Sequence, residues 1–351
     1  MKILIGISGG FDSSYCAFKL MKEGHTVECA VLKMHEYTDI DAAVKCAESL
    51  GLPLHVIDCT DSFSVVADNF INEYKNGRTP NPCIICNREV KFKYLLKFAL
   101  DNGFDKIATG HYARVTEQID GAERHYALSV ARDMRKDQTY MLYRLSEYTL
   151  SHLLLPMGEE LKDELRDNTP DELSFVKEKD DSQEICFIPD NDYATYIENR
   201  IGAFPEGDFV DESGNTLGKH RGIIRYTVGQ RKGLNIPSLQ RLYVTSIDSK
   251  SNTVHVSSEV ATDSVVKLVD VICSGLFEKK LANSEYITLD NISVKLRYQA
   301  PLVSAKAQIY KDGTAILYLD EPFKSVTPGQ SAVAYRDGTV LFGGIICSDK
   351  D

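Results

Sequence analysis

The chain has 351 residues, of which 43% are hydrophobic and 26% are charged, and its formal net charge is −11. This length allows two or three globular domains, and the acidic balance argues against a protein that binds nucleic acids indiscriminately. No apolar run approaches the ~18 residues of a membrane span. Met1 leads directly into a strand-like segment rather than a secretory leader, so we expect a cytoplasmic protein with no membrane partner.

The N-terminal half alternates between strand-like and helix-like segments. Strands are expected at residues 2–7, 26–34, 53–59 and 105–115, and helices at 13–24, 39–51, 62–76 and 88–102. This alternation predicts parallel βαβ units in a doubly wound, mostly parallel α/β sheet. Ligands bind at the carboxyl ends of strands in such sheets, so we expect the loops "SGGFDSS", "NPCIICN" and "TGHY" to gather at one edge.

The pattern changes after about residue 200, where short strand-like runs are separated by turns. These runs are residues 222–228, 241–248, 253–258, 292–298, 304–310, 314–319 and 330–336. Such spacing is typical of small β-rich domains or barrels. We therefore expect an α/β domain at 1–204, a small β-rich domain at 205–280 and a C-terminal β-barrel domain at 281–351.

The loop "SGGFDSS" follows the first expected strand and precedes the first helix. Backbone N–H groups and the helix dipole make such a junction an anion site. The loop lacks the GK[ST] ending of a Walker motif. Ser8, Gly9, Gly10, Asp12 and Ser13 match instead the pyrophosphate loop of ATP pyrophosphatases, which cleave ATP between the α and β phosphates and adenylate a carbonyl oxygen. The simpler alternative is a tight turn in which Asp12 caps the helix.

Three of the nine cysteines stand out from those on apolar-patterned stretches, which we expect to be packing residues. Cys83 and Cys86 precede the basic run 88–97 and are expected at a helix N-terminus, where the dipole and cations stabilise thiolates. Cys186 lies between an acidic turn at 180–184 and Pro189, and on its own would be read as a core residue. The spacing alone leaves a metal site, a redox pair and a sulfur-handling site open.

Residues 213–247 form a basic segment with no acidic residue. It contains Lys219, Arg221, Arg225, Arg231, Lys232 and Arg241. A local basic surface on an acidic protein suits a specific polyanion, whereas a solvated surface is the simpler alternative.

Eight stretches together resemble the tRNA-specific 2-thiouridylase (MnmA) family. They are "GISGGFDSS", "RTPNPCIICNREVKF", "IATGHYARV", "KDQTYMLYRLS", "DSQEICFI", "GKHRGIIRYTVGQRKGL", "VKLRYQ" and "TPGQ", and they run nearly end to end in the family's order. The resemblance implies an adenylating domain of the adenine nucleotide alpha hydrolase type, two smaller β domains that help hold tRNA, and ATP-dependent sulfur insertion at C2 of the wobble uridine.

The resemblance also implies roles for individual residues. Cys86 occupies the nucleophile position and Cys186 the persulfide position. ATP, accompanied by Mg²⁺, would be held by Gly6, Ile7, Ser8, Gly9, Gly10, Phe11, Asp12, Ser13, Leu32 and Gly110. The target base would face Asn81, Pro82 and Cys83, and tRNA would contact His111, Lys136, Asp137, Gln138, Arg297, Tyr298 and Gln330. The sulfur donor would be a cysteine desulfurase, a sulfur-relay protein or inorganic sulfide.

Cys83 departs from the family, which usually has aspartate there. Cys83, Cys86 and Cys186 are similar to the three cysteines that hold a [4Fe–4S] cluster with one open iron in a neighbouring group of tRNA thiolases. A structural zinc is less favoured because it needs four ligands. Two mechanisms remain open: a persulfide on Cys186 that Cys86 resolves as a disulfide, and a cluster that delivers sulfide, which the additional thiolate at Cys83 favours.

Two other function classes are compatible with parts of the sequence. One is a tRNA-binding or sulfur-trafficking module that has lost adenylation, although the intact "SGGFDSS" argues against it. The other is an adenylating ligase of a small molecule, which would need neither Cys86 nor the basic segment 213–247.

Overall fold

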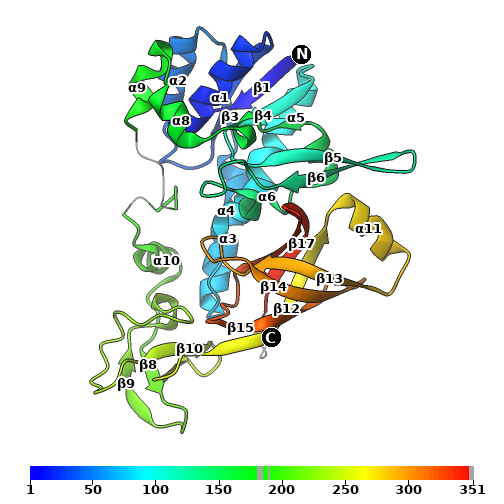
Figure 1. Cartoon of the computed structure of the whole chain (residues 1–351). Coiled ribbons are helices and arrows are strands. Elements are labelled where there is room, and N and C mark those ends of the chain that lie inside the picture. Colours follow the sequence, from blue (N-terminus) through cyan, green and yellow to red (C-terminus); the bar gives the residue numbers. More distant parts are fainter. Residues whose placement is uncertain (180–184, 189, 348–351) are drawn as a thin grey trace.

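The structure is a computed structural model that describes residues 1–179, 185–188 and 190–347 (Figure 1). The described residues form three sheets: one parallel, one small and mixed, and one long and antiparallel. In Figure 1 the parallel sheet lies at one end of the molecule, and the small sheet and most strands of the long sheet lie toward the opposite end. The predicted fold class, a doubly wound sheet followed by two β-rich parts, is confirmed.

The parallel sheet has the strand order β3-β2-β1-β4-β7. Its strands are β1 (Lys2–Gly6), β2 (Thr26–Lys33), β3 (Leu54–Asp58), β4 (Lys106–Thr109) and β7 (Leu153–Leu154). Ile3, Leu4 and Ile5 of β1 are fully buried, which explains the continuous apolar run, because helices cover both faces of such a sheet. The strand order reverses between β1 and β4, so a ligand crevice is expected at the carboxyl ends of these two strands.

The predicted helices of this domain are confirmed as α1 (Phe11–Lys22), α2 (Ile40–Leu50) and α3 (Thr60–Lys75). The helix expected at 88–102 is longer and has three segments: α4 (Pro82–Cys86), the π-helical η1 (Asn87–Lys91) and α5 (Phe92–Asp101). The Asn81 side chain caps α4 by accepting the Cys83 backbone N–H at 3.2 Å. The remaining helices are α6 (Thr139–Leu142), α7 (Glu147–Ser151), α8 (Lys162–Asp167), α9 (Ser174–Lys177) and α10 (Tyr193–Ile201).

The small sheet has the order β10-β11-β8-β9. Its strands are β8 (Gly207–Val210), β9 (Thr216–His220), β10 (Tyr243–Asp248) and β11 (Thr253–Ser257). The prediction of a strand at 222–228 was wrong, because a 3₁₀ turn, η4 (Ile223–Arg225), lies in that segment. Gly222 enters the turn with a φ of 93°, and the two adjacent isoleucines are both buried: Ile223 in the core of the small sheet and Ile224 in the core under α3. A strand would have pointed them to opposite faces of one sheet.

The long sheet closes into a barrel and then continues into the N-terminal domain. Its order is β12-β15-β14-β13-β16-β17-β6-β5, and an additional β12–β17 pairing closes the first six strands. The barrel strands are β12 (Thr262–Cys273), β13 (Tyr286–Lys295), β14 (Val303–Tyr310), β15 (Ala315–Lys324), β16 (Ser331–Arg336) and β17 (Thr339–Ile346), with α11 (Gly275–Ala282) after β12. The hairpin of β5 (Arg114–Asp120) and β6 (Glu123–Ser129) joins β17 at Ser129 and Thr339.

Strand pairing separates the small sheet from the barrel between residues 257 and 262, earlier than the predicted position at 280. The three-domain division itself stays a prediction. The acidic turn 180–184 and Pro189, which flank Cys186, lie outside the described residues. Among the helices of the described chain, none is both long and apolar enough to cross a membrane.

Candidate functional site

The loop between β1 and α1 is closed tightly around its own backbone. Gly9 has a φ of +71°, and a Cβ there would lie 2.5 Å from the backbone of Ala42 at the start of α2. The Ser13 hydroxyl accepts the Ser8 backbone N–H at 3.2 Å, and the Ser14 hydroxyl donates to the Gly10 carbonyl at 2.8 Å. The loop therefore presents the N-terminus of α1 as a fixed site of positive potential.

The loop after β4 packs directly against this helix N-terminus. A Cβ on Gly110 would lie 2.6 Å from the Ser13 backbone nitrogen, so no larger residue fits between the two loops. A cavity of about 370 Å³ opens beside them. Loop atoms of Ser8, Asp12 and Ser13 form one wall, and the apolar side chains of Val31, Leu32 and Met34 form another. A polar wall for phosphates opposite an apolar wall for a base matches the chemistry of a nucleotide.

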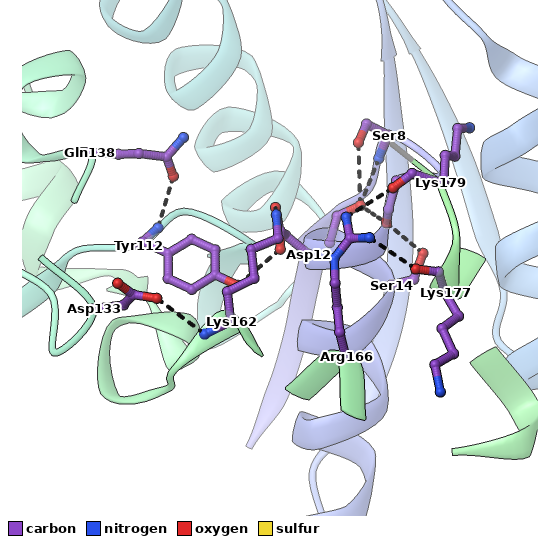
Figure 2. Close-up of polar contacts among 12 residues, drawn as sticks. Ser8, Asp12, Ser14, Tyr112, Asp133, Gln138, Lys162, Arg166, Lys177 and Lys179 are labelled. Atoms are coloured by element: carbon purple, nitrogen blue, oxygen red, sulfur yellow. Dashed lines mark hydrogen bonds and ion pairs between the residues drawn. The ribbon is translucent and has the colours of Figure 1, made fainter. Parts of the chain in front are cut away.

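Asp12 is the centre of a polar network (Figure 2). The Tyr112 hydroxyl donates to Asp12 Oδ1 and Lys162 Nζ donates to Asp12 Oδ2, both at 2.9 Å. The side chain of Lys162 is only 4% exposed. A buried ammonium is stable when it is paired, so this ion pair fixes both the start of α8 and the start of α1.

A second lysine reaches the same loop. Lys179 Nζ donates to the Gly9 carbonyl at 3.2 Å and lies 4.0 Å from Asp39. The Arg166 guanidinium donates to the carbonyls of Lys177 and Lys179, which positions this segment beside the loop, as Figure 2 shows. No local pattern predicts Lys162 or Lys179 as site residues, because they lie 150 and 170 residues from their partners in the loop.

A larger polar cavity of about 1000 Å³ adjoins the first. It reaches from the Asp12 network to Cys83, Lys295 and Tyr298. Both cavities are lined by Ser8, Asp12, Ser13, Asp39, Lys91, His111 and Gln138. The two cavities therefore meet along one wall. This wall lies between the cysteines and the loop that joins β1 to α1, which we call the phosphate loop.

The three cysteines lie at this junction. Cys83 is exposed to the larger cavity, Cys186 is exposed to the smaller one, and Cys86 is buried with its Sγ 3.6 Å from Met34 Sδ. Burial raises the pKa of Cys86 to about 12, and the charge of Lys91 opposes this rise. Loss of surrounding water also raises the pKa of Cys83 and of Cys186. At neutral pH all three are thus thiols in the protein alone.

Family models match three consecutive parts of the chain, and known proteins match nearly its whole length. Residues 1–190 match the family described as "tRNA methyl transferase HUP domain", 194–258 its PRC-barrel domain, and 281–346 the "Aminomethyltransferase beta-barrel domain". The tRNA-specific 2-thiouridylase MnmA of Acetivibrio thermocellus is 40% identical, over 98% of this chain and 99% of its own. The proteins of that name from Clostridium botulinum strain Alaska E43 and Treponema denticola are each 38% identical, over 98% and 99% of this chain and 97% and 98% of their own. The chain belongs to the tRNA-specific 2-thiouridylase family.

Most site residues predicted from the family resemblance come together around the two cavities. The smaller cavity is lined by Gly6, Ile7, Ser8, Asp12, Ser13, Leu32 and Gly110. Gly9 and Gly10 shape the loop, and Phe11, a buried core residue of α1, lines the larger cavity together with Gly10. The individual ATP contacts remain predictions for this member of the family.

The residues predicted to face tRNA divide into two groups. Cys83, His111, Lys136, Asp137, Gln138 and Tyr298 line the larger cavity. Asn81 caps α4, and Pro82 is buried as its first residue. Arg297 and Gln330 are not among the described residues that line either cavity. The guanidinium of Arg297 lies 5.6 Å from the Phe323 ring, and Gln330 Nε2 donates to the Thr79 carbonyl at 2.7 Å.

Asp137 and Gln138 belong to a polar tripeptide that would suggest an exposed surface turn, but their side chains make specific hydrogen bonds inside the protein. Asp137 is 6% exposed and accepts the Ala131 backbone N–H at 3.0 Å and the Thr139 hydroxyl at 2.6 Å. Gln138 accepts the Tyr112 N–H at 2.8 Å through its side chain. His111 is held neutral, because burial and the charge of Lys91 keep its pKa well below the ordinary value. Asp137, Gln138 and His111 therefore form part of the wall of the larger cavity.

The expected cluster ligands do not form a preformed metal site. Within residues 1–179, 185–188 and 190–347, no three His, Cys, Asp or Glu side chains are grouped so that they could hold a metal ion. All nine cysteines are free thiols, with no disulfide among the described residues. Cys86 points toward Met34, and Cys83 and Cys186 face different cavities. The three thiols thus lie near enough to influence one another's pKa, but the described residues show no preformed metal site.

Proposed function

We propose that the protein replaces O2 of the wobble uridine of tRNA with sulfur, at the expense of ATP. The observation that carries this proposal is the wall shared by the nucleotide cavity and the cysteine-lined cavity. ATP activates the oxygen O2 and sulfur then attacks C2, the carbon bonded to it, so the two half-reactions need sites that meet. Family membership supports tRNA as the substrate.

In the first half-reaction, uridine O2 attacks the α phosphorus of ATP and pyrophosphate leaves. The N-terminus of α1 and the loop backbone would stabilise the phosphoryl oxygens, and Lys162 and Lys179, which contact Asp12 and the Gly9 carbonyl, would offset the charge of the leaving pyrophosphate. ATP enters with Mg²⁺, whose charge would offset that of the phosphates, and Asp12 and Asp39 are the carboxylates that line the smaller cavity. The product is uridine adenylated on O2.

In the second half-reaction, a persulfide on Cys186 attacks C2 through its terminal sulfur. The bond between C2 and O2 breaks, and AMP leaves with that oxygen. The Cys86 thiolate then attacks Cys186 Sγ, which releases 2-thiouridine and leaves a disulfide between the two cysteines. The sulfane sulfur gains the two electrons that the thiols lose. An external dithiol restores the thiols, and a cysteine desulfurase or a sulfur-relay protein supplies the next sulfur.

A basic surface on the small sheet supports tRNA binding. Arg221, Arg231, Lys232 and Arg241 are exposed and form no ion pair with the described residues. Lys219 and Arg225, the other basic residues of segment 213–247, pair with Asp208 and Glu198. Unpaired surface cations attract the phosphate backbone of nucleic acids.

The test combines ATP, an unmodified tRNA transcript and a persulfide donor. We expect AMP and pyrophosphate to form only with tRNA, in the same amount as 2-thiouridine measured by mass spectrometry of nucleosides. Release of ADP, or AMP formation without tRNA, would refute the proposal and favour a small-molecule ligase. Turnover of ATP to AMP without thiolation would separate adenylation from the sulfur step.

The variant Cys83→Asp distinguishes the two sulfur mechanisms. Under the persulfide mechanism it retains thiolation, because only Cys86 and Cys186 handle sulfur, and Cys86→Ser is the inactive control. If the variant loses activity and anaerobically reconstituted wild-type protein binds iron with absorbance near 400 nm, the cluster mechanism replaces the persulfide one.

A further inference from the structure

We propose that Lys91 binds the α-phosphate at the junction of the two cavities, and so serves both the adenylation of the uridine and the departure of AMP. This inference rests on the proposed function and adds a residue with no role in it so far. Lys91 is half-buried and lines the smaller cavity, beside Gly110 and Cys186, and also the larger one, beside Cys83. Only the α-phosphate belongs to both half-reactions.

The π-helical turn explains how Lys91 reaches this position. Lys91 is the last residue of η1, five residues after Cys86, and its charge opposes the rise in the pKa of that thiol. Five residues along an α-helix of 3.6 residues per turn would place the two side chains on different faces. A π-turn, whose hydrogen bonds join residues five apart, is wider than an α-turn and brings the two side chains closer to one face, and such turns are frequent at functional sites.

The surroundings show that the Lys91 charge acts on the reacting groups. It influences the thiols of Cys83, Cys86 and Cys186 and the imidazole of His111. His111 itself is neutral, so it supplies no charge to a phosphate. The ammonium of Lys91 is therefore the cation that stands between the three thiols and the phosphate loop.

The other cations of the larger cavity are already engaged. Lys162 pairs with Asp12, and Lys179 contacts the Gly9 carbonyl and Asp39. Arg135 pairs with Asp133 and Asp163, and the charge of Lys295 is coupled to Asp137. Lys136 also has a partner. By contrast, Lys91 forms no ion pair and no side-chain hydrogen bond with any part of the chain that the structure describes.

The position of Lys91 favours the α-phosphate over the pyrophosphate. Lys162 and Lys179 contact Asp12 and the Gly9 carbonyl, on the loop side where the β and γ phosphates are expected. Lys91 lies on the side of the cysteines, where only the phosphate attached to uridine remains after pyrophosphate has left. A half-buried ammonium without a carboxylate partner is stabilised when an anion arrives.

The test uses the two diastereomers of ATPαS, in which sulfur replaces one or the other non-bridging oxygen of the α-phosphate. We expect the wild-type enzyme to use one diastereomer more slowly, because its sulfur replaces the oxygen that Lys91 contacts. Lys91→Met should lower AMP formation from ATP by about 100-fold and bring the ratio of the two rates close to one. Lys91→Arg should keep part of the ratio.

Lys93→Met is the matched control, because Lys93 lies two residues away, is 62% exposed and reaches Glu89 at 3.8 Å. It should leave both the rate and the ratio unchanged. An unchanged diastereomer ratio in Lys91→Met, at any activity, overturns the inference. If Lys91→Met does not fold, Lys91→Arg decides by the same ratio. Wild-type enzyme that makes no AMP with tRNA refutes the proposed function instead, so the two failures are distinguishable.

Discussion

Replacing Gly9 by alanine tests whether the shape of the phosphate loop is set by glycine geometry. A left-handed φ of +71° costs an alanine ~1–2 kcal/mol. The added Cβ would also lie 2.5 Å from Ala42, against backbone that cannot move without shifting α2. Overpacking of this kind costs a further ~1–3 kcal/mol. We expect a loss of ~2–5 kcal/mol in the free energy of unfolding, or a displaced loop that no longer binds ATP.

Gly24→Ala separates the two contributions. Gly24, at the end of α1, has a φ of +82° but nothing within 4 Å of an added Cβ, so it should lose only the conformational part. Thermal unfolding and calorimetric ATP titration of both variants give the comparison. If Gly9→Ala melts at the same temperature as Gly24→Ala and binds ATP like the wild type, the steric argument for the loop is wrong.

Three further outcomes are expected. Iodoacetamide should alkylate Cys86 slowly at pH 7 and about tenfold faster per pH unit up to pH 9, because the pKa of this thiol is about 12 and only the thiolate reacts. Peptide mass mapping measures the rate of alkylation, and a rate that does not change with pH would contradict a buried thiol at this position. Lys162→Met should lower the unfolding free energy by ~1–3 kcal/mol by removing a charged hydrogen bond to Asp12, and an unchanged melting temperature would argue against that pair. Exchanging Arg231 and Lys232 for glutamate should weaken tRNA binding and reduce the slope of log affinity against log salt by about two; unchanged binding would remove this surface from the tRNA site.

The parallel sheet could be predicted because local signals and tertiary structure agree there. The apolar run of β1 is buried on both faces, and glycine ends α2 at Gly51 with a left-handed φ. The prediction of a strand at 222–228 rested on β-branched residues, which favour strands. It was wrong because Ile223 and Ile224 are buried in two different cores, which a strand in one sheet would not allow. The start of the barrel was hidden for a related reason, since β12 pairs with β15 and β17, far along the chain.

At the site, the loop residues were predictable and their partners were not. A glycine-rich turn between a strand and a helix specifies its own geometry through nearby residues. Lys162, Lys179 and Arg166 reach the loop only through the packing of α8 and the segment after α9, which no local pattern encodes. The sequence also did not predict that Cys86 is buried while Cys83 is exposed. Both lie on one short helix, and the contact of Cys86 with Met34 depends on tertiary packing.

The cysteine at position 83 affects the charge of the cavity, and this effect is separate from any role of its thiol in sulfur transfer. The family resemblance places an aspartate there, which would bring a negative charge into the cavity beside Lys91. Cys83 is a thiol whose pKa is raised, so at neutral pH this wall carries no charge at that point. A carboxylate would compete with phosphate for the ammonium, whereas a neutral thiol leaves it available. In this chain, therefore, the substitution strengthens the attraction of the junction for a phosphate even if Cys83 never touches the transferred sulfur.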